Sequence, residues 1–409
     1  MDISPKDRSI IRDLAKRVAE IAGLPVMAER RKMWTKHNAL QRVRPMILVF
    51  PEGAWRELIT PKDMQCESAA VHWIEWSLRS RIYTHEHIHD DKPVDKGWVV
   101  GKVINSTSWG VDAKWKWSSE PLGARAFDPV ILEPADLKKF KQPEISVDEQ
   151  ASQRSLADFE ELFGDILEVR QKGISSLSYH LMNQYTGLRG LEQVMVDMIE
   201  SPGMLHDAMA FLEQAHRNIL KQYVDLNLLS LNNDGTYHSS GGLGYTDELP
   251  APGFDQARVR PCDIWASAEA QELALVSPGM HEEFSLQYER RLLAPFGLNG
   301  YGCCEDLTRK LDYALTIPNI RRMSIAPAAD VDKCAEKLGN KCIFSWKPQP
   351  AYMCGRFDAA QIREYIKHTL DVTKDCVIEM ILKDTHTCDS HPERFTIWTD
   401  VAQELAAAY

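Results

Sequence analysis

The stretch Met46-Ile47-Leu48-Val49-Phe50 is a continuous apolar run, and Pro51-Glu52-Gly53 stops it at once. A short run that is apolar on both faces and ends in Pro or Gly is typical of a strand buried in a parallel sheet. Similar runs recur at residues 225–231, 322–325, 342–346 and 377–382, with weaker candidates at 98–103, 174–177 and 298–301. The run at 46–50 therefore predicts the first strand of a repeating architecture.

Amphipathic segments that predict helices lie between these runs, at residues 190–201, 204–223, 278–293, 330–338 and 359–374. A strand followed by a helix, repeated about eight times, gives parallel βαβ units, and a closed ring accommodates that number better than an open sheet. The expected fold is therefore α/β, a (β/α)8 or TIM barrel.

The regions outside the repeat predict two additions to the barrel. Residues 1–45 have helical periodicity, with Ser4-Pro5 as an N-cap and first-turn proline, and predict an N-terminal helical extension. Residues 46–409 are expected to form the catalytic barrel domain. Within it, residues 109–153 fit the repeat poorly and predict an inserted loop or small subdomain.

Composition restricts the partners and the compartment. The 409 residues carry a net charge of −11, which repels nucleic acid. The chain has neither an apolar leader after Met1 nor the roughly 18 uninterrupted apolar residues of a membrane span. Its nine cysteines, an odd number, are expected to be thiols in a cytoplasmic protein. No G-x-G-x-x-G motif follows a predicted strand, which weighs against a dinucleotide-binding site. The protein is a possible homodimer.

Functional groups of a barrel gather where strands end, and the richest strand end is Tyr301-Gly302-Cys303-Cys304-Glu305-Asp306. The last strand is followed by Thr385-His386-Thr387-Cys388. Thiolate and imidazole together suit Zn²⁺, so Cys303, Cys304, His386 and Cys388 form one candidate metal set. The alternative is unliganded thiols beside His386 as a general acid, with Glu305 as a second catalytic candidate.

Other strand ends supply candidate substrate-binding residues. Glu52 and Trp55 follow the first strand, and Glu269 lies near another strand end. A glycine-rich loop at residues 233–245 carries His238 and Tyr245. We expect these five side chains to contact the substrate.

A histidine-rich segment, Tyr83-Thr84-His85-Glu86-His87-Ile88-His89-Asp90-Asp91, follows the second predicted strand unit. Three alternate histidines beside two carboxylates are unfavourable to bury unless they bind something. Asp91 is accordingly a candidate catalytic carboxylate. The alternative is an ordinary solvated turn.

From about Arg44 onward the chain resembles the uroporphyrinogen decarboxylase superfamily. The resemblance rests on the segments at residues 185–191, 197–204, 277–284, 302–305 and 338–341, in this order. It implies a (β/α)8 barrel with one of two activities. One branch decarboxylates uroporphyrinogen without a cofactor, and the other contains zinc methyltransferases that work with a separate corrinoid protein.

The decarboxylase branch carries an early Arg-Gln-Ala-Gly-Arg-Tyr signature that grips acetate side chains. The corresponding stretch here is similar to Pro51-Glu52-Gly53-Ala54-Trp55-Arg56-Glu57, with one arginine and two glutamates. Carboxylates in place of cations would repel a substrate with eight carboxylates. The resemblance therefore favours the methyltransferase branch.

Many members of that branch place a His-x-Cys motif after the middle strand and a Cys after the last one. Cys303 matches a ligand position, Tyr301 does not, and His386 stands where the last Cys is expected. Some ether-cleaving members of the superfamily have a different set of metal ligands, two glutamates and a histidine. A rival metal set here is Glu52, Glu67 and His87 or His89.

These observations predict transfer of a methyl group from an O- or N-methylated small molecule to a corrinoid on a partner protein. Zinc, or a proton from His386, would stabilise the leaving group, while Tyr245, His238 and Glu269 would orient the donor. Two alternatives remain: a cofactor-independent decarboxylase that uses Asp90 or Asp91 together with His386, and a carrier that binds a tetrapyrrole or corrinoid.

Overall fold

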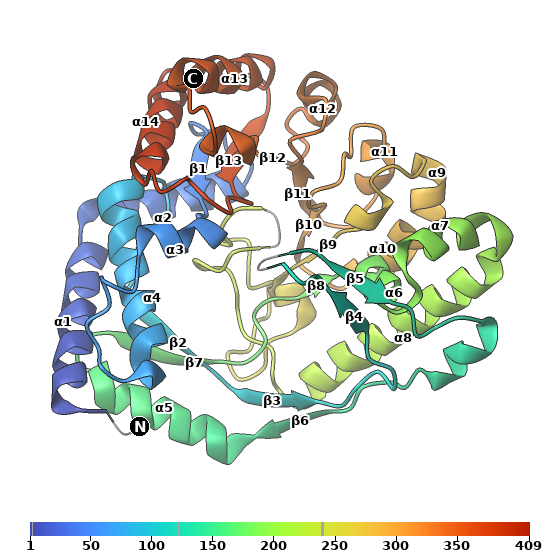
Figure 1. Ribbon diagram of the computed structural model, residues 1–409, viewed down its shortest axis with the longest axis horizontal. Helices are drawn as coiled ribbons and strands as arrows, with labels where there is room; N and C mark the ends of the chain where they lie inside the picture. The colour runs from blue at the N-terminus through green and yellow to red at the C-terminus, as the bar shows by residue number, and fades with distance from the viewer. Residues whose placement is uncertain (2, 121–122, 239–240) are drawn as a thin grey trace.

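The computed structural model describes residues 1, 3–120, 123–238 and 241–409. Seven parallel strands form its central sheet, in the order β1-β13-β12-β11-β10-β9-β8 (Figure 1). Their bounds are β1 Met46–Val49, β13 Val377–Leu382, β12 Ile343–Trp346, β11 Ile320–Ile325, β10 Leu298–Tyr301, β9 Trp265–Ala268 and β8 Ser178–Tyr179. Because every neighbouring pair is parallel, the carboxyl ends of these strands lie along one edge.

A second parallel pair, β2 (Gly97–Gly101) and β7 (Glu168–Lys172), continues the curved wall. The Asp91 N–H donates to the Ile47 carbonyl at 2.9 Å, next to β1. On the other side an isolated parallel bridge joins Ile174 to Leu229. The arrangement is a mixed α/β fold that is compatible with a TIM-barrel-like architecture.

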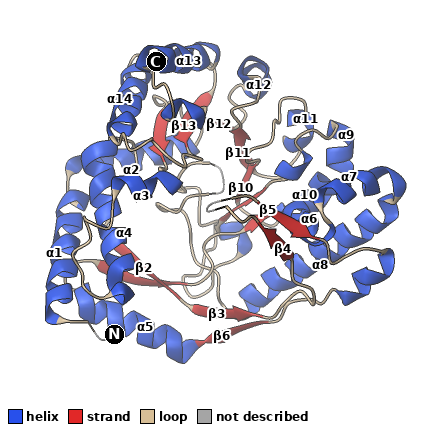
Figure 2. Cartoon of the chain, viewed as in Figure 1, coloured by secondary structure: helices blue, strands red, loops and turns tan. Residues whose placement is uncertain are grey.

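Helices cover the outside of the strands (Figure 2). Their bounds are α1 Pro5–Ala22, α2 Pro25–Asn38, α3 Trp55–Leu58, α4 His72–Tyr83, α5 Glu149–Phe163, α6 Leu181–Arg189, α7 Leu191–Glu200, α8 Pro202–Asp225, α9 Pro278–His281, α10 Gln287–Leu293, α11 Leu311–Ala314, α12 Val331–Leu338, α13 Ala359–Val372 and α14 Glu393–Ala407. Within the described ranges, no helix combines the length and apolar character that crossing a bilayer requires.

The two faces of each strand are packed differently. Ile47 and Val49 of β1 belong to the large apolar cluster that also contains residues of the outer helices. Met46 and Leu48, which point the other way, contact a small cluster around Trp34 of α2. Helix α2 of the N-terminal region therefore packs against the inner face of the sheet.

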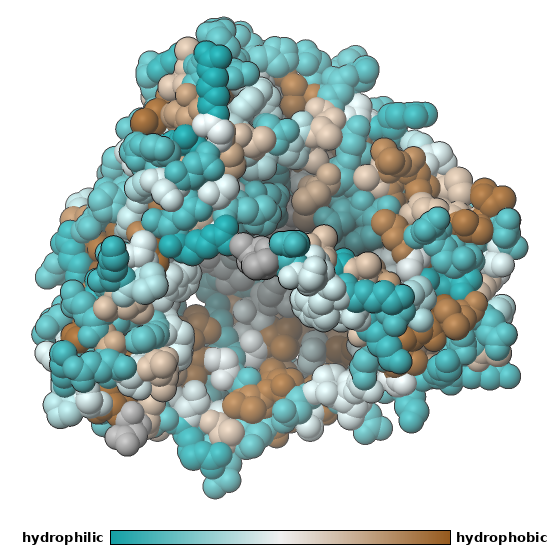
Figure 3. Space-filling model, in the orientation of Figure 1, coloured by the Kyte–Doolittle hydropathy of each residue, from teal (hydrophilic) through white to brown (hydrophobic). Residues whose placement is uncertain are grey.

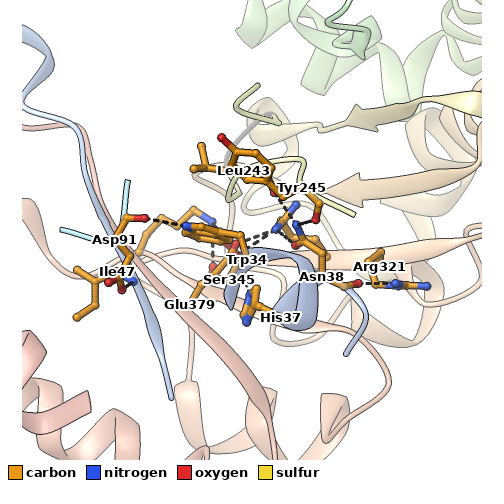
Figure 4. A network of polar contacts seen from close by, with 12 residues as sticks. Trp34, His37, Asn38, Ile47, Asp91, Leu243, Tyr245, Arg321, Ser345 and Glu379 are labelled. Carbon is orange, nitrogen blue, oxygen red and sulfur yellow. Dashed lines mark hydrogen bonds and ion pairs between the residues drawn. The ribbon is translucent and has the colours of Figure 1, made fainter. Parts of the chain in front are cut away.

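A buried polar network joins α2 to the sheet (Figure 4). Arg322 of β11 pairs with Glu379 of β13 at 2.8 Å, and His37 of α2 contacts the same carboxylate at 3.0 Å. The Asn38 amide donates to the Leu243 and Tyr245 carbonyls, both at 2.7 Å. Burial opposes the charge of Glu379, but Arg322 and His37 hold the pKa of its carboxyl well below the usual value. The network ties α2, two strands and the loop after residue 241 together.

Three sequence expectations differ from the structure. The run at 225–231 was expected to form a strand. Instead, helix α8 ends at Asp225, and the residues after it contain one isolated bridge, at Leu229. Residues 174–177 were also expected to form a strand, but they lie between β7 and β8. Their apolar side chains, Ile174 and Leu177, pack against the core without regular strand pairing. The expected helix at 278–293 is interrupted by a π-helical turn, Glu282–Leu286.

The segment that fits the repeat poorly contains two antiparallel pairs. Strand β3 (Val103–Ser106) pairs with β6 (Ile145–Asp148), and β4 (Lys114–Trp117) pairs with β5 (Arg125–Asp128). The β4–β5 pair contacts α6 in front of the central sheet (Figure 1). Alternating aromatic and charged residues such as Trp115 and Lys116 suit such a half-exposed pair.

The close approach of the glycine-rich loop to the network predicts a strict requirement for glycine. A Cβ at Gly242 would lie 2.5 Å from Glu379 Oε2 and 2.6 Å from the Trp34 ring. We expect Gly242→Ala to lower the free energy of unfolding by about 1–3 kcal/mol. Chemical denaturation measures this change.

The matched control is Gly203→Ala in α8, where an added Cβ meets nothing within 4 Å. That change should be neutral or stabilise by up to about 1 kcal/mol. Equal stability of the two variants would contradict the packing described for Gly242.

Candidate functional site

Polar side chains directly follow the strands at the carboxyl edge of the central sheet, and we call this set the strand-end cluster. Its members are His180 after β8, Glu269 after β9, Cys303 and Cys304 after β10, Lys347 after β12, Lys383 and Asp384 after β13, and Glu52 after β1. Parallel strands bring these residues to one edge although they span more than three hundred positions of sequence.

His180 and Glu269 form the closest pair of the cluster. His180 Nδ1 contacts Glu269 Oε1, and the other carboxylate oxygen accepts the Gln271 N–H at 2.9 Å. Glu269 is buried, whereas the His180 side chain is 45% exposed. Burial disfavours the imidazolium, but the hydrogen bond and charge of Glu269 raise the pKa of His180 above its usual value. This arrangement suits a partly exposed proton donor.

The double-thiol turn meets the end of the last strand. Cys303 and Cys304 place their sulfur atoms 3.5 Å apart, and the Cys304 thiol lies 3.9 Å from Asp384 Oδ2. Cys303 also acts electrostatically on His180 and raises its pKa. The gathering of distant strand ends that the barrel argument expects is therefore present for these residues.

Glu305 lies beneath the thiol turn. Its carboxylate accepts the Cys303 N–H at 2.8 Å and the Ala270 N–H at 3.2 Å. Burial and the neighbouring Glu269 raise the pKa of Glu305 to about 7. The side chain is fully buried, so it holds the turn against β9 and acts as a positioning residue.

Two lysines of the cluster were missed from the sequence. Lys347 is buried and donates to the carbonyl and hydroxyl oxygens of Ser345 at 2.9 and 2.8 Å. Burial lowers the pKa of Lys347 to about 7. Burial also disfavours the charge of Lys383, but Cys303 and Asp384 raise its pKa. The available signal was position, because each lysine directly follows a predicted strand.

Glu52 and His386 lie at the junction of β1 and β13. The Glu52 carboxylate accepts the Asp384 N–H at 3.1 Å, and burial with the charge of Asp384 raises its pKa. The exposed His386 offers its backbone carbonyl to Arg56 at 3.0 Å. Trp55 packs edge-on against Trp76 of α4, with the ring centroids 5.7 Å apart. Glu52 thus joins the cluster, while His386 stands at its rim.

Cys388 has a different hydrogen-bond partner from the other two cysteines of the candidate metal set. Its thiol donates to Glu57 Oε2 at 3.1 Å. Burial and this carboxylate raise the pKa of Cys388 to about 12, which keeps the sulfur protonated. A protonated thiol is a poor metal ligand.

The residues of the rival metal set are dispersed. Glu67 pairs with Lys6 at 2.6 Å beside α1, and His89 pairs with Asp400 of α14 at 3.1 Å. The His87 ring stacks on Tyr83 in a π-helical turn. Over the described ranges, no three His, Cys, Asp or Glu side chains are grouped so that they could hold a metal.

Three further candidates have internal contacts. His238 is buried, bonds the Asn232 carbonyl at 3.0 Å and stacks on Trp265; burial lowers its pKa to about 3. Tyr245 is buried in the cluster around Trp34. Asp91 pairs with Arg44 at 2.6 Å and accepts the Ile47 N–H at 2.8 Å, at the amino-terminal part of β1. The first two belong to the interior, and Asp91 lies away from the strand ends. Ser239 and Ser240 of the glycine-rich loop lie outside the described residues.

Similarity to known proteins is found among solved structures. No family model matches the chain, and no curated protein matches it. The solved structure of a methyltransferase from Methanosarcina mazei is similar over 92% of this chain and 98% of that chain. The sequence identity is 10% and the TM-score is 0.47.

The His180–Glu269 pair predicts a measurable titration. Because its pKa is raised, the imidazolium of His180 should persist above pH 6.5 and be lost as the pH rises through the raised value. In Glu269→Gln, burial acts without the carboxylate, so the midpoint should fall to 6.5 or below. NMR of labelled histidine rings measures both midpoints, with His180→Gln to assign the signal. An unchanged midpoint would contradict the coupling.

Proposed function

We propose that the strand-end cluster catalyses transfer of a methyl group from an O- or N-methylated small molecule to a corrinoid carried by a separate protein. The observation that carries the proposal is the His180–Glu269 pair, on which Cys303 of the double-thiol turn acts electrostatically. Demethylation of an ether or amine needs a proton for the leaving group, and this pair is built to supply one.

The chain's own residues perform three tasks in this proposal. A Co(I) corrinoid supplies the nucleophile that receives the methyl group. His180 donates its proton to the oxygen or nitrogen that leaves with the bonding electron pair. Glu269 stabilises the imidazolium before this transfer, and the charge of Cys303 adds to that effect. Glu305 holds Cys303 in place through the backbone.

Zinc, which the superfamily resemblance implies, does not fit the donors present. A catalytic zinc site has three protein ligands with one open position. Cys388 is bonded to Glu57, His386 is at the rim, and within the described chain no third donor joins the two thiols. The proton of His180 therefore has the role that zinc would otherwise have.

We also infer that the wall of strands closes as a barrel around this site. The contact between Asp91 and Ile47 leads from β1 towards β2, and the bridge between Ile174 and Leu229 leads from β7 back towards β9. The Asn232 side chain bonds the backbone of Trp265 at 2.9 and 3.0 Å, which extends that connection.

A decarboxylase is the second candidate, and one observation favours it. Lys347 and Lys383 are two amino groups at the strand ends, and in their protonated forms they would hold a substrate carboxylate. Release of CO2 from a cyclic carboxylate without Co(I) would support this activity over methyl transfer.

Methyl transfer to free cob(I)alamin provides the direct test. With a panel of O- and N-methylated compounds, formation of the cobalt–methyl product is followed by its absorption change. We expect His180→Gln and Glu269→Gln to lower kcat by about 10²–10⁴-fold, as for loss of a general acid. The loss should be smaller with donors whose leaving groups are more acidic.

The matched control is His368→Gln, which removes an exposed histidine that pairs with Asp332 at 3.1 Å on the outer helices. Its activity should equal that of the unchanged protein. Full activity of His180→Gln would refute the assignment of the proton donor.

Cys303→Ala tests the electrostatic role of the thiol turn. Loss of its charge should lower the pKa of His180, so the alkaline limb of the rate–pH profile should move to lower pH. Cys262→Ala, on a surface turn before β9, is the control. Bound zinc that disappears in Cys303→Ala, with an unmoved pH profile, would instead indicate a metal at the thiols.

A further inference from the structure

A cavity of about 460 Å³ lies between α4, β2 and the end of β7. The lining residues used below are Trp55, Trp76, Arg81, Lys92, Lys172 and Asp234. Figure 3 shows that the face of the molecule over this region is hollowed. A volume of this size accommodates a small organic molecule.

The charges in the cavity wall do not cancel. Lys172 pairs with Asp234 at 2.5 Å, and this pair is neutral overall. Arg81 donates to the Gly97 carbonyl at 2.9 Å and lies near Asp95. Lys92 remains, and over the described residues its ammonium group has no ion pair within 4.0 Å. The wall therefore carries one cation more than its carboxylates balance.

The buried Asp90 carboxylate lies outside the cavity lining and compensates Lys92 only in part. Asp90 accepts the Val49 N–H at 3.0 Å and the Lys92 N–H at 3.1 Å. Burial raises the pKa of Asp90 to about 6. Burial lowers the pKa of Lys92, although the charges of Asp90 and Asp95 oppose this effect. An anionic ligand in the cavity would add to their compensation of the ammonium group.

Part of the cavity wall is aromatic. The rings of Trp55 and Trp76 meet edge-on at 5.7 Å, and Trp55 also contacts Tyr83 at 5.8 Å. Trp76 is 38% exposed although it is one of the largest apolar side chains. Two indole rings beside a cavity are suited to contact with a flat apolar body.

The cavity adjoins the strand-end cluster through two aromatic rings. The Lys92 ammonium lies 5.6 Å from the centre of the Phe50 ring, and Phe50 packs against Tyr237 at 4.6 Å. Burial and Glu379 raise the pKa of Tyr237, and Cys303 and Glu52 raise it further. Tyr237 is therefore close to both the cavity and the cluster.

We propose that this cavity binds the methyl donor and that the donor is a small organic carboxylate. Its carboxylate would lie against Lys92 and Arg81, and its apolar body against Trp55 and Trp76. The part of this proposal that concerns the donor rests on the proposed function. Binding of a small organic carboxylate in the cavity does not.

Calorimetric titration of the full chain tests the binding with a matched pair of probes, benzoate and its neutral analogue benzamide. We expect benzoate to bind about 10- to 100-fold more tightly, as one charge-assisted hydrogen bond provides. Acetate has the charge without the apolar body and should bind at least 10-fold more weakly than benzoate. Equal affinity for benzoate and benzamide, or for benzoate and inorganic phosphate, would overturn the proposal.

Lys92→Met removes the unbalanced cation, and Lys96→Met is its control. Lys96 is exposed on the same segment and does not line the cavity. We expect Lys92→Met to abolish the preference for benzoate over benzamide, while Lys96→Met preserves it. Because burial disfavours the Lys92 cation, methionine should keep the fold, which thermal unfolding verifies. A retained preference in folded Lys92→Met would overturn the assignment of the cation.

The activity assay separates the two proposals. Methyl transfer from methylated carboxylates, and not from their amides, supports both. Transfer from the neutral amides alone overturns the carboxylate assignment and leaves the proposed function standing. Selective binding of benzoate without transfer from any donor leaves the binding site standing and overturns the proposed function.

Discussion

The buried ion pair between Arg322 and Glu379 is the interaction on which much of the architecture depends. Two charges inside the wall of strands are tolerable only with further partners, and His37 and Asn38 of α2 provide them. The same side chains leave no room for a Cβ at Gly241 or Gly242 of the glycine-rich loop. A single polar centre therefore fixes the position of an N-terminal helix, two strands and a long loop.

In the strand-end cluster, the pKa values of the basic side chains depend on nearby thiols and carboxylates as well as on burial. Cys303 raises the pKa of His180 and acts against the effect of burial on Lys347 and Lys383. The carboxylates have two different tasks. Glu269 holds a proton on an exposed imidazole, while Glu305 accepts backbone N–H groups and fixes a turn. Two buried glutamates thus have separate roles because their hydrogen-bond partners differ.

The sequence predicted the regular part of this structure because periodicity reports burial. The runs at 298–301, 342–346 and 377–382 match β10, β12 and β13 almost residue for residue, and Ser4-Pro5 marks the start of α1. It also predicted that the double-thiol turn would face His386 or Cys388 after the last strand, whereas the contact seen there is between Cys304 and Asp384. Residues 225–231 were misassigned because an apolar run alone does not distinguish a strand from a buried irregular segment. The pairing of His180 with Glu269 joins positions 89 apart, and no local pattern reports such a contact.

The insertion of α2 against the inner face of the sheet also affects how the chain must assemble. Trp34, His37 and Asn38 leave the ribosome early, whereas Arg322 and Glu379 are synthesised more than 280 residues later. Contacts of such large sequence separation form slowly, since a long loop of chain must close first. Helix α2 must therefore wait for β11 and β13, which are synthesised later. During translation its apolar indole and polar side chains remain without their final partners, so this helix is where chaperone binding would most affect folding.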